Sequence, residues 1–112
     1  MVYETTENIR KLVSKKDAGV YYLEFSSGKG YIGSSIELYT RLCGHLNSMR
    51  KGNHKSPLLQ EEYNKCGFPN IKILLKEHVM NIMEITVREK ENEYSKTVDT
   101  SLNNKEFHII RR

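Results

Sequence analysis

Two extended runs around a short turn are the feature that most constrains this chain. Five of the six residues at 20–25 are β-branched, aromatic or leucine, and such residues suit the pleated surface of a strand. Residues 26–30, SSGKG, supply turn chemistry, because glycine adopts positive φ without a steric penalty. The extended run resumes at residues 31–33. The pattern therefore predicts an antiparallel hairpin with Tyr21 and Tyr31 close across the strand pair, an arrangement more often found in sheet packing than in catalysis.

Length and composition narrow the class of protein. The chain has 112 residues, enough for one small domain with a single core, and its 38% hydrophobic content excludes a disordered tail. The formal net charge of +4 suits a polyanionic partner without identifying one. No apolar run is long enough for a membrane span or a signal segment, so we expect a cytoplasmic protein with no membrane partner. Cys43 and Cys66 are isolated, which indicates reduced thiols rather than a zinc site.

The first part of the chain is polar, with Ile9 and Val13 at helical spacing. We expect a short packing helix there and interpret residues 1–18 as an N-terminal helical extension. The remaining residues 19–112 then form the single domain, and residues 17–19 are the expected break before the first strand.

The stretch after the hairpin predicts a long helix. Ser34 and Glu37 have the spacing of a capping box, and an apolar stripe follows them to a glycine stop at Gly52. The stripe consists of Leu38, Leu42, Leu46 and Met49. Arg41 and His45 are four residues apart, so they share one face of this helix.

The second half of the chain predicts two more helices and a strand. Ser56 as N-cap and a following proline begin a helix that ends near residue 66. Alternating residues at 71–76 indicate a third strand, and residues 80–98 form the last strong helix pattern. One face of that helix is apolar except for a single carboxylate: Met83, Val87, Glu91, Tyr94 and Val98. A terminal strand or tail packing back on the domain is expected from Phe107, Ile109 and Ile110.

Several of these residues have the chemistry that phosphodiester hydrolysis requires. The reaction needs a cation on the scissile phosphate, a base for the attacking water and stabilisation of the leaving 3′-oxygen. Arg41 offers a planar fork of donors, and His45 lies one turn further on. Glu91 needs a metal ion or a donor if it is buried, and Mg²⁺ can bind through one protein carboxylate, waters and substrate phosphate. Taken singly, each residue also fits a solvated surface position.

Further groups could complete such a site. Substrate contacts are expected from four residues at the helix end and in the next loop: Arg50, Lys51, His54 and Lys55. Tyr21 and Tyr31 are candidates for a base or a water-orienting group. With an ordinary pKa of about 10, a tyrosine acts as a base only near positive charge or metal-bound water.

Jointly, these residues resemble the GIY-YIG nuclease family. The two triplets are GVY at residues 19–21 and YIG at residues 31–33, with a shorter interval than is usual in the family. As in the phage and intron-encoded branch, Arg41 and His45 follow on the first helix, and a Gly-x-His-x-Ser loop occupies residues 52–56. The resemblance extends from residue 19 to about residue 104.

The resemblance continues on the last long helix. The family's metal-binding glutamate stands three residues before an aromatic, as Glu91 does before Tyr94, and the family's asparagine corresponds to Asn103. Glu89 is a rival metal ligand, because many members have Arg-Glu at this point, and Asn104 would then be the partner asparagine. We prefer Glu91 because its helix face is otherwise apolar.

The resemblance implies an α+β fold, a small three-stranded antiparallel sheet flanked by helices. It also implies a DNA endonuclease with one Mg²⁺ or Mn²⁺ ion, held by Glu91 or by its rival Glu89. The implied catalytic residues are Tyr21, Tyr31, Arg41, His45 and Glu91. The implied structural residues are Gly19, Gly33 and Asn103.

The biological role has several alternatives. We favour a homing-type endonuclease of a phage or mobile element, over a restriction enzyme or a repair nicking enzyme. A nucleic-acid-binding module without catalytic activity is the alternative from another functional class. The sequence has no helix-turn-helix or zinc-finger signature. Three alternatives follow for targeting: cleavage with low specificity, a homodimer, or a separate targeting subunit.

Overall fold

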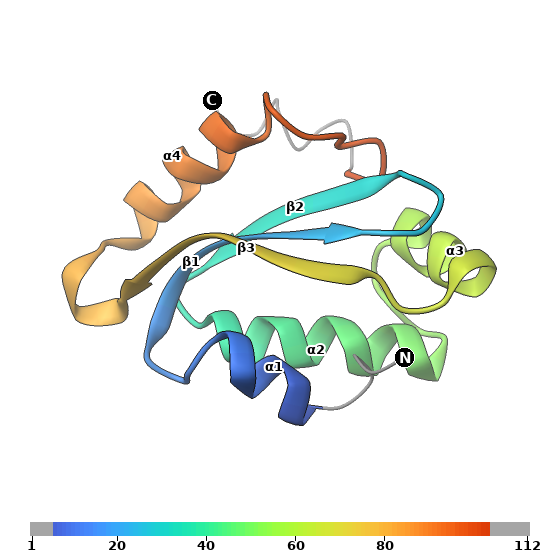
Figure 1. Cartoon of the computed structure of the whole chain (residues 1–112), viewed down its shortest axis with the longest axis horizontal. Coiled ribbons are helices and arrows are strands. Elements are labelled where there is room, and N and C mark those ends of the chain that lie inside the picture. The colour runs from blue at the N-terminus through green and yellow to red at the C-terminus, as the bar shows by residue number, and fades with distance from the viewer. Residues whose placement is uncertain (1–5, 104–112) are drawn as a thin grey trace.

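The computed structural model describes residues 6–103, which form a three-stranded antiparallel sheet covered by helices on both faces (Figure 1). The strands lie in the order β2-β1-β3, and their bounds are β1 (Asp17–Glu24), β2 (Gly30–Ser35) and β3 (Asn70–His78). The helices are α1 (Thr6–Leu12), α2 (Leu38–Lys51), α3 (Pro57–Cys66), the 3-10 turn η1 (Val79–Asn81) and α4 (Glu84–Tyr94). The α+β class and the predicted three-stranded sheet are confirmed.

The hairpin forms as the sequence predicts. Tyr21 pairs with Gly33 and Leu23 with Tyr31, so the two tyrosines are diagonal neighbours on one sheet face. Their ring centroids are 6.5 Å apart. The expected break at residues 17–19 is wrong, because β1 begins at Asp17 and those residues pair with β3.

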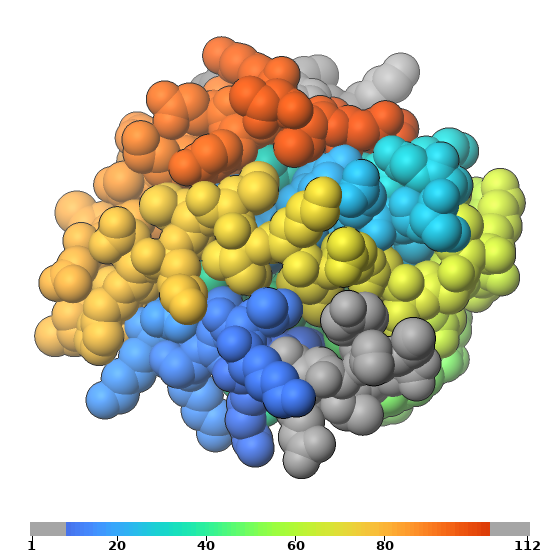
Figure 2. All heavy atoms as spheres, in the orientation of Figure 1, coloured from blue at the N-terminus to red at the C-terminus, as the bar shows by residue number. Residues whose placement is uncertain are grey.

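The alternation of β1 divides the core between the two faces of the sheet. Tyr21, Leu23 and other buried residues pack with α1, α2 and α3, whereas Val20 and Tyr22 pack on the opposite face, toward Tyr94. Helices α1 and α2 accordingly lie on one side of the sheet and α4 on the other (Figure 1). In the space-filling view, side chains of β3 reach the surface between α1 and α4 (Figure 2). Within the described residues, no helix is long and apolar enough to cross a bilayer.

Helix α2 starts differently from the prediction. Its N-cap is Glu37 without a side-chain cap, and the backbone N–H of Glu37 donates to Ser35 Oγ at 2.8 Å. The predicted capping box is therefore wrong, since Ser34 still belongs to β2 and its hydroxyl bonds to α4. The four apolar stripe residues are all buried, and the helix ends at Gly52 with φ of 81°, as expected. The Ser56 cap of α3 is also confirmed.

Helix α4 is shorter at both ends than the predicted range 80–98. At its start, β3 runs on to His78, whose Nδ1 accepts from the Met80 N–H, and η1 occupies the next residues. Met83 is therefore not part of the buried stripe, and 69% of its surface is exposed. At the other end, the Ser95 hydroxyl donates to a backbone carbonyl, which competes with helix propagation. The predicted terminal segment with Phe107, Ile109 and Ile110 lies outside the described residues.

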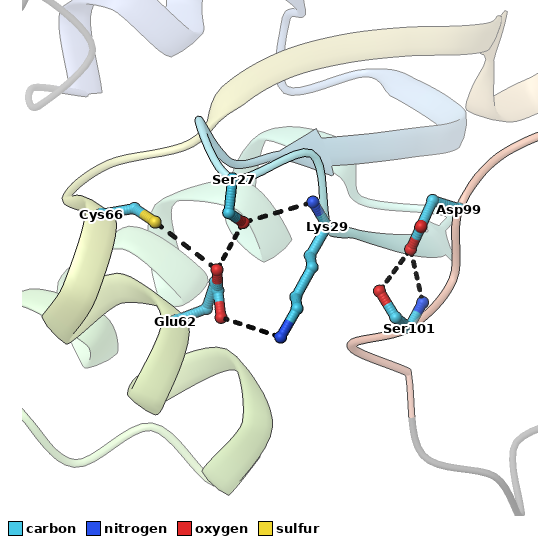
Figure 3. A network of polar contacts seen from close by, with 6 residues as sticks. All are labelled: Ser27, Lys29, Glu62, Cys66, Asp99 and Ser101. Atoms are coloured by element: carbon cyan, nitrogen blue, oxygen red, sulfur yellow. Dashed lines mark hydrogen bonds and ion pairs between the residues drawn. The ribbon is translucent and has the colours of Figure 1, made fainter.

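A polar network connects the hairpin turn to α3 (Figure 3). Glu62 of α3 is only 4% exposed, and it accepts a 2.5 Å hydrogen bond from the Ser27 hydroxyl. The Cys66 thiol donates to the same carboxylate, and the Lys29 ammonium lies 4.0 Å away. These contacts, the serine bond first, hold the pKa of the Glu62 carboxyl below its usual range. The network fixes the position of the turn, and no sequence pattern marks Glu62 as a buried residue.

Candidate active site

A cavity of about 530 Å³ brings together four of the five predicted catalytic residues. Tyr21 of β1, Tyr31 of β2, Arg41 of α2 and Glu91 of α4 all line it. The other lining residues are Gly33, Ser34, Ile85, Arg88, Glu89 and Asn92. A larger hollow of about 810 Å³ lies between the hairpin turn and the end of α3, but none of the predicted catalytic residues lines it.

Gly33 makes room for the Tyr21 ring. A Cβ atom at Gly33 would lie 2.3 Å from Tyr21 Oη, which is closer than any side chain tolerates. A similar close approach occurs at Gly19, where a Cβ would lie 1.8 Å from the carbonyl oxygen of Leu75 on β3. Both glycines of the two sequence triplets are thus positions where a neighbour occupies the side-chain space.

Both tyrosines are protonated at neutral pH in the absence of other charges. Burial, and then the neighbouring Tyr31, raise the pKa of Tyr21 well above its usual value, while the Arg41 guanidinium acts in the opposite direction. The pKa of Tyr31 is also raised, chiefly by burial and next by the Glu91 carboxylate. Added positive charge in this cavity would therefore favour ionisation of either hydroxyl.

His45 contacts Tyr21 from the side of α2. His45 Nε2 lies 2.6 Å from Tyr21 Oη, and His45 Nδ1 lies 2.8 Å from His54 Nε2. His54 Nδ1 in turn accepts from the backbone N–H of Ser56 at 2.9 Å. Burial is the main cause that lowers the pKa of His45, to about 3, and it lowers that of His54 as well. Both rings are therefore neutral at neutral pH.

The neutral charge of both rings determines the direction of this hydrogen-bond chain. Because the Ser56 amide can only donate, His54 carries its proton on Nε2 and donates to His45 Nδ1. His45 then carries its proton on Nε2 and donates to the Tyr21 oxygen. As a result, the hydroxyl proton of Tyr21 is free to point into the cavity.

Glu91 projects from the buried face of α4. Its residue surface is 5% exposed, and its Oε1 accepts a short hydrogen bond from the Ser34 hydroxyl. Val87, one turn earlier, is also buried, so the predicted buried face of the helix begins at Val87. Glu89 lines the same cavity from a more exposed position. Both carboxylates considered in the sequence analysis therefore reach the site.

Comparison with known proteins places this arrangement in a family. The sequence profile of the GIY-YIG catalytic domain matches residues 17–106. The chain belongs to the GIY-YIG family. No curated protein sequence matches it significantly. Membership implies a nuclease activity and hence a nucleic-acid substrate.

Two solved structures have a similar fold, and both are catalytic domains of the homing endonuclease I-TevI. The first matches with a TM-score of 0.65 and 26% identity, covering 78% of this chain and 94% of that chain. The other, a mutant of the intron endonuclease I-TevI, matches with a TM-score of 0.62 and 26% identity. It covers 73% of this chain and 84% of that chain.

GIY-YIG nucleases generally use a divalent metal, and the donor set of this cavity fits one kind of ion. Within residues 6–103, no group of three or more histidine, cysteine or acidic side chains is placed to hold a metal. The cavity does present the carboxylates of Glu91 and Glu89. Mg²⁺ binds through one or two carboxylates while it keeps waters and takes up substrate phosphate, so these residues fit Mg²⁺ or Mn²⁺ and not a structural zinc ion.

The remaining predicted residues of this GIY-YIG domain lie outside the cavity. Arg50, Lys51 and Lys55 are exposed, and the Arg50 guanidinium donates to Asn47 Oδ1 at 2.6 Å. His54 reaches Tyr21 only through His45. Their predicted role in substrate binding stays a prediction.

Asn103 joins the segment after α4 to the sheet. Its Oδ1 accepts from the Ile32 N–H and its Nδ2 donates to the Ile32 carbonyl, both at 2.9 Å. The side chain thus pairs with β2 as a neighbouring strand would. Asn104, the partner of the rival assignment, is outside the described residues.

Four cavity residues do not follow from the sequence as site residues. They are Ser34, which the sequence predicts in a helix cap, and Ile85, Arg88 and Asn92 of α4. A signal did exist for Arg88, because it lies three residues before Glu91 and thus close to the same helix face. The position of Ser34 depends on how β2 packs against α4, which the local sequence does not encode.

Proposed function

We propose that this protein is a DNA endonuclease of the homing type, from a phage or another mobile element, that depends on one Mg²⁺ or Mn²⁺ ion. The observation that carries the proposal is the convergence of Tyr21, Tyr31, Arg41 and Glu91 on one cavity. The similarity to the I-TevI catalytic domain, which is described as a homing endonuclease, supports the finer assignment.

In the proposed mechanism, Arg41 binds a non-bridging oxygen of the scissile phosphate, because its guanidinium is always charged and presents a planar fork of donors. Glu91 would hold the divalent ion, and the ion would supply positive charge that stabilises the phosphate and the leaving 3′-oxygen. Ser34 orients that carboxylate by donating to Oε1.

Tyr21 positions the attacking water for in-line displacement. The His45 N–H stabilises negative charge on the Tyr21 oxygen. The phenol's own proton, which points into the cavity, leaves to solvent water there, and the resulting phenolate then accepts the proton of the attacking water. Tyr31 lies on the same sheet face and can share this orienting role. Asn103 keeps the C-terminal segment on the sheet without contacting substrate. The product would be a break with a 5′-phosphate.

Plasmid cleavage with and without Mg²⁺ tests the proposal. Replacing the carboxylate with Glu91→Gln should lower cleavage by about 100-fold or more while DNA binding in EDTA is retained, because the amide is a poor metal ligand. Glu93→Gln is the matched control, since Glu93 is exposed on the same helix and pairs with Lys90. Glu89→Gln decides between the two candidate ligands.

Other outcomes support the alternatives. Binding without Mg²⁺-dependent cleavage would leave a nucleic-acid-binding module without catalytic activity. Cleavage that only nicks supercoiled plasmid would favour a repair enzyme, and cutting at one short sequence would favour a restriction enzyme. Sedimentation with a DNA duplex would show whether a homodimer forms, as targeting by two copies requires. The division into an extension of residues 1–18 and a nuclease domain of residues 19–112 stays a prediction. Ile9 packs in the common core, and β1 begins at Asp17, within the predicted extension.

A further inference from the structure

A second, smaller hollow adjoins the proposed active site. It has a volume of about 220 Å³ and shares Ser34, Arg41 and Arg88 with the larger cavity. Two guanidinium groups thus line both hollows, whereas the mechanism above uses only Arg41. The smaller hollow also holds two carboxylates, those of Glu37 and Glu84.

Arg88 is held only weakly in its present position. Its Nη2 lies 3.2 Å from Glu84 Oε2, and the two side chains are 64% and 60% exposed. An exposed pair at i,i+4 on a helix contributes little to stability, because water and salt screen it. The guanidinium can therefore exchange this carboxylate for another anion at low cost.

We propose that the smaller hollow is a subsite for the phosphate next to the scissile one on the same strand, and that Arg88 binds this phosphate in place of Glu84. The inference rests on the proposed function, because it takes the scissile phosphate to lie at Arg41. A strand that places one phosphate in the larger cavity must continue through an adjoining space, and the adjoining hollow is lined by both arginines. A planar guanidinium suits bidentate contact with phosphate oxygens.

Glu84 has the opposite effect on such a subsite. Its carboxylate competes with phosphate for Arg88 and repels it electrostatically. Removing the arginine should therefore weaken DNA binding, and removing the carboxylate should tighten it.

DNA affinity measured in EDTA over a series of salt concentrations tests this. Arg88→Gln should weaken binding several-fold and reduce the slope of log K against log salt by about 0.9, the value for one lost phosphate contact. Glu84→Gln should strengthen binding. Lys90→Gln is the matched control, because Lys90 is a paired cation of the same helix that lines neither hollow. Equal slopes for the two cation variants, or weaker binding by Glu84→Gln, would overturn the subsite.

A neutral methylphosphonate locates the contact once plasmid cleavage has mapped a cut site. Placed next to the scissile phosphate, it should weaken binding by the wild-type protein but cause no further loss in Arg88→Gln. Additive losses would show that Arg88 contacts DNA elsewhere. The salt series and the cleavage assay test the subsite and the nuclease activity separately. An Arg88-dependent slope without cleavage would reject the nuclease and leave Arg88 as a phosphate contact of a DNA-binding surface, whereas cleavage with an unchanged slope would keep the nuclease and overturn the subsite.

Discussion

Glu91 and Glu62 are two helix glutamates in nearly identical local circumstances. They are 5% and 4% exposed, and each accepts a hydrogen bond from a serine of the hairpin region, Ser34 and Ser27 respectively. Their wider surroundings differ. Glu62 has a thiol donor and the Lys29 ammonium beside it, whereas Glu91 lines a cavity together with two tyrosines and an arginine.

The difference shows that burial of a carboxylate does not by itself indicate catalysis. An acidic side chain removed from water needs donors or a cation, and Glu62 obtains these from its own chain. Glu91 also accepts a hydrogen bond from its own chain, and in addition it lines open volume that can admit an ion and a phosphate. In this fold, a buried glutamate is a candidate site residue when it lines a cavity, and burial alone does not distinguish it from a structural residue.

The largest effect on cleavage is expected at Tyr21, which lines the same cavity as Glu91 and so tests its contrast with Glu62. Tyr21→Phe should lower cleavage by about 100-fold or more, because the hydroxyl that orients water is lost. Tyr22→Phe is the matched control: it is the next residue of β1, faces the opposite side and donates to the Asp99 carbonyl at 2.6 Å. Single-turnover cleavage rates measure both. Equal losses of cleavage rate in the two variants would contradict a specific role for the cavity hydroxyl of Tyr21.

The two serines allow a direct comparison of the two acids. Ser34→Ala should weaken Mn²⁺ binding about 10-fold, because the donor that orients the proposed metal ligand is gone. Ser27→Ala should leave Mn²⁺ affinity unchanged, since its partner has no part in the proposed metal site. Calorimetric titration of each variant with Mn²⁺ gives the affinities. The comparison would break if Ser27→Ala weakened Mn²⁺ binding as much as Ser34→Ala did.

The smallest effect is expected from Glu62→Gln. The variant should lower the free energy of unfolding by about 1 kcal/mol at pH 7, because charge-assisted bonds become neutral ones, while cleavage stays within about twofold. The folded-state pKa of Glu62 lies below its ordinary value of 4.5. Its stabilisation is therefore present above pH 4.5 and is lost as the pH falls through the folded-state pKa.

Urea unfolding at pH 7 and at several values below 4.5 measures this dependence. The difference between the wild-type protein and Glu62→Gln should shrink in acid. A difference that grows instead would mean that the folded state raises the pKa of this group. Loss of cleavage in the variant would mean that Glu62 also acts in the site.

Local patterns in the sequence were sufficient for most of the fold. The hairpin, the buried stripe of α2 and the Ser56 cap depend on neighbours in the chain, and each was predicted correctly. The limits of α4 were not, because they depend on how far β3 extends and on a serine that bonds to the backbone. Glu62 was missed because its partner Ser27 lies 35 residues away.

The candidate site followed a similar division. Its aromatic and basic members stand in recognisable motifs, and these motifs bring Tyr21, Tyr31 and Arg41 to one cavity. Ser34, which reaches the cavity through the packing of β2 against α4, has no local signature. The choice between Glu91 and Glu89 could not be made by helix geometry, since both contribute to the lining.

The polarity of the chain from Ser56 through His54 and His45 to Tyr21 has a consequence for redesign of this protein. The chain of hydrogen bonds begins at a main-chain N–H donor, and only a substitution by proline would remove this donor. A replacement of His54 that can only donate to His45 preserves the direction of the hydrogen bond between His45 and Tyr21. A replacement that can only accept from His45 reverses that hydrogen bond. A substitution in this loop can therefore change whether a buried phenol accepts or donates its hydrogen bond, without altering the phenol itself.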